Sequence, residues 1–155
     1  GTAKVTARNM CLLLAYLEKI DYIHTRISVI VDESLEMDNY VHNVLKKIIN
    51  QEKFDPPLNN QLFDFISKEE CAKVYYHLGH SGKNKSDYFI GTGEPMTLHE
   101  FFHEFSQKIH GKKVDSLGKA SLDNLILTKE DFDSSDVSKD TGFTPSKPNF
   151  NYINQ

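Results

Sequence analysis

Apolar side chains recur three and four positions apart along residues 3–17, a stretch without Gly or Pro. This period is typical of an amphipathic helix with one buried stripe, and its apolar positions are Ala7, Met10, Cys11, Leu14 and Leu17. Leu12 and Leu13 widen the stripe, so we expect a helix that is covered on more than one side. Residues 22–31 are rich in β-branched and aromatic side chains and predict a strand. A helix followed closely by an apolar strand favours an α/β fold with a parallel sheet.

The rest of the chain alternates between helical and strand periods. We predict helices at 40–51, from 67 to 78, from 97 to about 110 and at 135–140, and strands at 61–66, 88–91 and 125–127. Asp38 or Asn39, Ser67 and Thr97 stand where N-caps are expected. Glu70 follows Ser67 at the spacing of a capping box.

Length and charge narrow the classes of protein that the chain can represent. We treat its 155 residues as a single domain, complete or part of a longer protein. The net charge of −4, without a stripe of Lys and Arg, argues against a nucleic-acid-binding protein. No apolar run is long enough for a membrane span, and no signal peptide is present. Cys11 and Cys71 fall in predicted helices, so we expect buried, reduced thiols and a cytoplasmic protein.

Several motifs, in order along the chain, resemble one family. Lys4 looks like the lysine of a Tyr-x-x-x-Lys motif, and residues 62–73 resemble Asp-Phe-Val-x-Val-Asp-Asp-x-Ala. Residues 88–95 resemble Tyr-x-Ile-Gly-x-Gly-x-x. The spacing of a closing motif, Asp-x-Ser-Lys…Gly-Phe-x-Pro, is matched by Asp133, Ser135, Gly142, Phe143 and Pro145. These are motifs of the extended short-chain dehydrogenases, the NAD(P)-dependent nucleotide-sugar epimerases and dehydratases. The chain is similar to the C-terminal half of such an enzyme over nearly its whole length.

The resemblance implies a partial Rossmann-like sheet that carries the substrate-side portion of the enzyme. It implies hydride transfer between nicotinamide and a sugar carbon, with Lys4 as the catalytic lysine that lowers the pKa of a tyrosine. That tyrosine would stand immediately before Gly1, outside this sequence. The strand that carries Ser28 would reach the sugar nucleotide, so Arg26, Ser28 and Asp64 are the candidate substrate-binding residues. For Arg26, a charge within an apolar strand, an ion pair with Asp64 is the favoured alternative to a ligand contact.

The sequence also departs from this family. The glycine-rich dinucleotide loop belongs to the half of the enzyme that this sequence lacks. Residues 31–34 replace a Tyr-Gly-Pro-Gly turn, and Glu69 and Glu70 replace an Asp-Asp pair. NAD or NADP would serve the parent family, whereas we expect neither to bind this chain alone. We therefore expect a fragment or a degenerate relative, inactive alone.

Two alternatives to that interpretation stay open. The first is a non-catalytic binding or assembly module on the same fold. Whether the chain is such a module or a fragment of an enzyme, we expect a homodimer, or a complex with a separate N-terminal chain, that forms through the first helix and first strand. The second is a zinc hydrolase, because His99, Glu100 and His103 match His-Glu-x-x-His, in which two imidazoles one helical turn apart share zinc. The third ligand is missing, and seven histidines make a chance match plausible, so we expect no metal.

Overall fold

The computed structural model describes residues 1–32, 34–55, 60–114 and 127–150. Its elements, in chain order, are α1 (Thr2–Glu18), β1 (His24–Ile27), β2 (Val29–Val31), α2 (Tyr40–Ile49), β3 (Leu62–Phe63), β4 (Phe65–Ser67), α3 (Lys68–Ser81), β5 (Asp87–Ile90), β6 (Met96–Thr97), α4 (Leu98–His110), the 3₁₀ helix η1 (Lys129–Phe132) and α5 (Ser135–Thr141). The predicted strand at 125–127 falls largely outside the described residues, and residues 151–155 lie wholly outside them.

The first predicted strand changes its partner halfway along. β1 pairs with β5 in parallel, and β2 pairs with β4 in parallel. The change occurs at Ser28, whose amide donates to the carbonyl of Ile90 at 2.9 Å, while the next amide, of Val29, donates to the carbonyl of Asp64 at 3.0 Å. The prediction of one strand over 22–31 is therefore wrong in detail. The predicted strand at 61–66 is likewise divided at Asp64, because β3 pairs with β6 in an antiparallel manner.

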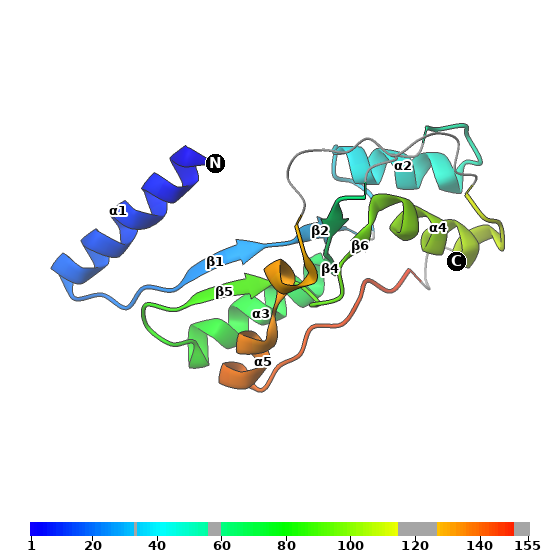
Figure 1. Cartoon of the computed structure of the whole chain (residues 1–155). Coiled ribbons are helices and arrows are strands. Elements are labelled where there is room, and N and C mark those ends of the chain that lie inside the picture. The colour runs from blue at the N-terminus through cyan, green and yellow to red at the C-terminus, as the bar shows by residue number, and fades with distance from the viewer. Residues whose placement is uncertain (33, 56–59, 115–126, 151–155) are drawn as a thin grey trace.

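Helices cover both faces of the β2–β4 pair, which is the arrangement expected of an α/β fold. On one face, α2 and α4 close a core that contains Val31 and Phe65. On the other face, α3 and α5 close a second core that contains Ile66, with Ile30 packed against it. Alternate residues of each strand thus enter opposite cores, as the two-residue period of a strand requires. Figure 1 shows the two helix pairs on either side of these strands. The predicted fold class is confirmed.

The helix boundaries follow local capping signals. The side chain of Asn39 accepts from the amide of His42 and begins α2, and Ser67 accepts from Glu70 and begins α3. Thr97 forms a full capping box with Glu100 at the start of α4. The three predicted N-caps are confirmed. None of the helices within the described residues is both long and apolar enough to span a membrane.

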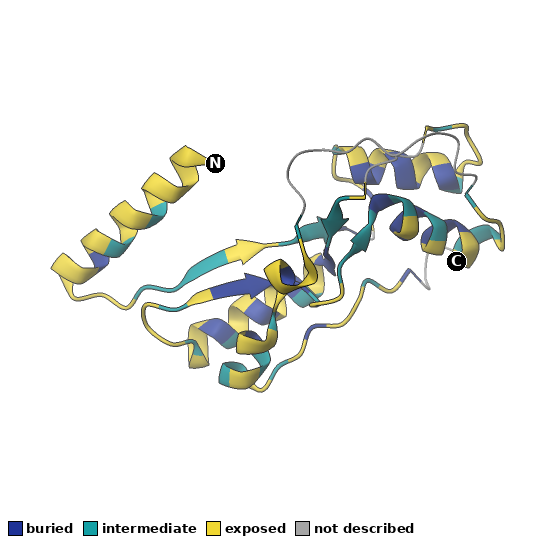
Figure 2. Cartoon of the chain, viewed as in Figure 1, coloured by how far each residue is buried: buried dark blue, intermediate teal, exposed yellow. Residues whose placement is uncertain are grey.

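The first helix differs most from expectation. α1 extends away from the remaining elements (Figure 1), and most of its surface is exposed along its whole length (Figure 2). Ala15 is its buried residue, whereas Leu13, Leu14 and Leu17 are all more than half exposed. The buried stripe predicted from its period is not buried in this chain. Cys11 on this helix is exposed, so the expectation of a buried thiol is wrong there, and it is confirmed for Cys71.

Candidate functional site

A large hollow of the described surface lies between α1 and the first strand. Its volume is about 730 Å³, and it is open to solvent. Its lining residues are Lys4, Val5, Arg8, His24, Thr25, Arg26, Ile27 and Asp87. We call it the α1–β1 hollow. It brings together two of the four residues singled out in the sequence, Lys4 and Arg26, from elements joined by a short connection.

An ion pair connects the two walls of the α1–β1 hollow. The Nε of Arg8 on α1 donates to Oδ1 of Asp87 on β5 at 3.1 Å, and its Nη2 contacts Oδ2. Because both side chains are partly exposed, this pair contributes little to folding stability. It nevertheless neutralises the one carboxylate of the lining. Lys4 and Arg26 therefore give the hollow a cationic lining.

Arg26 is exposed rather than buried. Its guanidinium carbon lies 5.7 Å from the ring centroid of Phe89, the residue opposite it on β5, which is a cation–π distance. Asp64 does not take part in this contact, because its carboxylate accepts hydrogen bonds from Thr92 and Gly93. The expected Arg26–Asp64 ion pair is wrong. The physical reason is that the sheet face carrying Arg26 is open to solvent at this position, and the ion pairs of the described residues do not include Arg26.

Replacing Arg26 with Leu should therefore change the free energy of unfolding by no more than about 1 kcal/mol, the value of an exposed cation–π contact. Urea unfolding of the two proteins measures this difference. A loss of about 3 kcal/mol would instead indicate that the substitution strands a buried carboxylate.

Asp64 organises the turn that follows β5. Its side chain is almost fully buried, and it accepts three hydrogen bonds: from the amide of Thr92 at 3.0 Å, from the hydroxyl of Thr92 at 2.7 Å and from the amide of Gly93 at 2.7 Å. A Cβ on Gly91 would lie 2.6 Å from Oδ2 of Asp64, and Gly93 adopts a positive φ of 75°. Both glycines are thus required by the turn that surrounds this carboxylate.

The same contacts decide whether this turn suits a dinucleotide phosphate. A phosphate-binding loop presents free backbone N–H groups at a helix N-terminus. Here the amides of Thr92 and Gly93 already point at the carboxylate of Asp64, an internal anion. This turn therefore does not fit the diphosphate of NAD or NADP.

Ser28 lies at the junction where β1 ends and β2 begins, and it is not among the residues that line the α1–β1 hollow. Its hydroxyl oxygen is buried and has no hydrogen-bond partner among the described residues. Ser28 and Asp64 are neighbours at this junction, since adjacent amides of the first strand bond to Ile90 and Asp64. The four candidate residues thus fall into two groups, one in the α1–β1 hollow and one at the strand junction.

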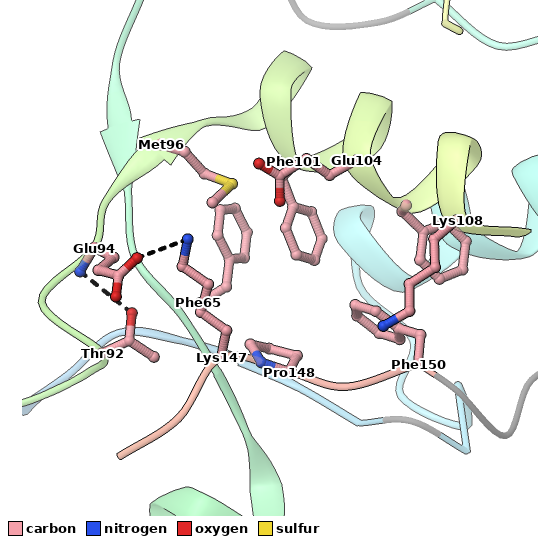
Figure 3. A pocket seen from close by; sticks show the side chains of 11 residues that line it. Phe65, Thr92, Glu94, Met96, Phe101, Glu104, Lys108, Lys147, Pro148 and Phe150 are labelled. Carbon is pink, nitrogen blue, oxygen red and sulfur yellow. Dashed lines mark hydrogen bonds and ion pairs between the residues drawn. The ribbon is translucent and has the colours of Figure 1, made fainter. Parts of the chain in front are cut away.

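The sequence did not indicate a second, more enclosed pocket of about 100 Å³ beside α4 (Figure 3). Its wall is formed by Phe65 and Phe101, whose rings stack with centroids 3.8 Å apart. The ion pair between Lys147 and Glu94, at 2.8 Å, lies at its mouth and raises the pKa of Lys147. This volume is below the range of about 300–1,000 Å³ typical of pockets for drug-sized ligands. Its lining joins α4 to residues 147–150, which are distant in the sequence, so no local motif indicated it.

The two histidines of the His-Glu-x-x-His match lie on α4, with ring centroids 6.3 Å apart. The carboxylate of Glu100 accepts from the amide and hydroxyl of Thr97, which lowers its pKa and commits it to the capping box. Within the described residues, no group of three or more His, Cys, Asp and Glu could hold a metal ion. The arrangement gives no support to a zinc hydrolase.

Comparison with solved structures identifies the fold class. The chain matches UDP-glucose 4-epimerase from Thermotoga maritima with a TM-score of 0.70 and 15% identity, covering 94% of this chain and 47% of that one. It matches dTDP-glucose 4,6-dehydratase from Bacillus anthracis with a TM-score of 0.74 and 14% identity, covering 99% and 48%. For UDP-glucuronic acid 4-epimerase from Bacillus cereus, the TM-score is 0.72 and the identity 17%, covering 96% and 48%.

These matches show that the chain has the Rossmann-like fold of nucleotide-sugar epimerases and dehydratases, as the sequence motifs predicted. The chain spans about half the length of these structures. No family model and no curated protein matches the sequence.

Proposed function

We propose that the chain is the substrate-side portion of an NAD(P)-dependent nucleotide-sugar epimerase or dehydratase, and that it is inactive alone. The fold match over nearly the whole chain, to about half of each enzyme, carries this proposal. Structures in that set were solved with NAD and with sugar nucleotides, such as UDP-glucuronic acid. By analogy, the substrate class would be a sugar nucleotide.

Within this proposal, Lys4 is the catalytic lysine and Arg26 lies beside it at the substrate. Their common position in the α1–β1 hollow supports this pairing. Ser28 would contact the substrate from the strand junction, and Asp64 would act by shaping the turn at residues 92–93. The cofactor site and the tyrosine would come from the other half of the enzyme. We also propose a cytoplasmic location, in keeping with two free cysteines.

The gene sequence upstream of Gly1 tests the proposal directly. A Tyr codon immediately before Gly1, and a glycine-rich βα turn roughly 140 residues earlier, would complete the enzyme. An upstream sequence with neither feature would favour a second candidate function, a binding or assembly module. The observation that favours this candidate is the exposed apolar surface of α1, which includes Met10, Leu13 and Leu17.

The chain alone should not bind NAD or NADP. The amides of the turn at Thr92 and Gly93 are already bonded to Asp64, and the sequence contains no other glycine-rich phosphate loop. Calorimetric titration of each dinucleotide should therefore give no saturable heat, with a full-length dTDP-glucose 4,6-dehydratase as the positive control. Micromolar affinity of either dinucleotide for this chain would contradict the proposal that the cofactor site lies in the other half of the enzyme.

A further inference from the structure

His42 is the one histidine among the described residues that is fully buried. It lies in the first turn of α2, where both of its ring nitrogens have a partner. Nε2 lies 2.8 Å from the backbone nitrogen of Asp32, at the end of β2. Nδ1 lies 2.8 Å from Oδ1 of Asn39, the N-cap of α2. The imidazole therefore joins the end of a strand to the start of the next helix.

These partners fix the protonation state of the ring. A backbone N–H can only donate, so Nε2 must accept from Asp32 and carry no proton. The amide of His42 itself donates to Oδ1 of Asn39 at 3.0 Å, so this oxygen is an acceptor. Nδ1 must then carry the proton and donate to the same oxygen. Both contacts require the neutral Nδ1–H tautomer, and adding a proton at Nε2 would place two donors against each other.

The charges around His42 come from three elements. Asp32, at the end of β2, is an ionised carboxylate whose pKa is held at about 2, chiefly by its hydrogen bond from Lys68 at the start of α3 and also by Ser34. Lys46 follows one turn later on α2. α4, which packs on α2, contributes apolar side chains to the same core. Burial lowers the pKa of His42, the charge of Asp32 opposes this shift, and Lys46 adds to it.

We propose that His42 is an acid-sensitive latch that holds the end of β2 to the start of α2 and releases this junction when its ring is protonated. The inference does not depend on the proposed enzymatic function. Because the pKa of His42 is lowered in the folded chain, the closed junction binds fewer protons than the open one. The latch is thus fully closed above the ordinary histidine value near 6.5 and weakens as the pH falls below it. Asp32, with a pKa of about 2, and Lys68, with a raised pKa, keep their charges throughout this range.

The test is hydrogen exchange of the whole chain at pH 7.5 and 5.5, corrected for the intrinsic exchange rate. One proton linked to an open-state pKa near 6.5 predicts that protection of the Asp32 amide falls by up to about tenfold between pH 7.5 and pH 5.5. His42→Gln places an amide oxygen near the position of Nε2 without a titrating group, so its protection should not change with pH. His80→Gln, on the exposed surface of α3, should retain the wild-type response.

Unchanged protection in the wild-type protein, or an equal loss in His42→Gln, would overturn the proposal. If His42→Gln does not fold, ¹⁵N spectra of the wild-type imidazole provide the second measurement. The latch requires an unprotonated Nε2 at pH 7.5 and a titration of His42 below that of an ordinary histidine. The opposite tautomer, or an ordinary titration, would also overturn it.

Discussion

Asp64→Ala should lower the free energy of unfolding by about 4 kcal/mol, the largest loss that we expect from a single polar substitution in this chain. The carboxylate of Asp64 accepts the amide and hydroxyl of Thr92 and the amide of Gly93. Removing it leaves three donors without an acceptor beside a buried strand junction. A buried donor that loses its partner costs about 1–3 kcal/mol, and these three, on half-buried Thr92 and exposed Gly93, fall toward the lower end of that range.

Urea unfolding monitored by circular dichroism measures the loss for Asp64→Ala. Asp133→Ala is the matched control, because Asp133 also accepts a backbone amide, that of Ser135, but lies on the exposed surface. A clearly smaller loss is expected for the control. Equal losses for the two variants would show that burial of the Asp64 carboxylate is not what makes it important.

The second large effect is on association. α1 exposes Met10, Leu13, Leu14 and Leu17, which share the apolar stripe predicted from the sequence. Exposed apolar patches of several hundred Å² are unusual on monomeric proteins. Among the described residues β1 pairs on one side only, with β5, so its other edge adds a second surface for association next to this helix. We expect these two elements to be the contact surface of a homodimer or of a separate N-terminal chain.

Light scattering at micromolar concentration should give twice the mass of one chain. Replacing Leu13 and Leu17 together with Glu should return the protein to one chain mass, because it places two charges on the apolar stripe. Tyr76→Glu, at an equally exposed residue of α3, should leave the dimer intact. A monomeric wild-type protein with slow amide exchange from Ile23 to Val29 would count against association through this surface.

Local signals in the sequence predicted local structure well. Asn39, Ser67 and Thr97 cap their helices because a cap involves residues only two or three positions apart. The buried face of α4, with Phe101, Phe102 and Phe105, follows equally from a local period.

Contacts between distant residues could not be predicted in the same way. The bond from Asp64 to the turn at Thr92 spans 28 residues, and the pocket beside α4 depends on Lys147. For Arg26, an apolar sequence context indicated burial, but exposure depends on which strand lies next to β1. The stripe of α1 was predicted correctly as apolar. Its burial depends on distant surfaces, and the described residues do not cover it.

The β2–β4 ribbon has a consequence for how the protein unfolds. Each strand is three residues long and sends alternate side chains into two separate cores, Val31 and Phe65 to one and Ile30 and Ile66 to the other. The cooperativity between the two cores is therefore transmitted through this short ribbon. A substitution that leaves a cavity beside these strands, as at Ile66, would destabilise both cores together. A substitution in a helix, away from these strands, would destabilise only the core that this helix covers.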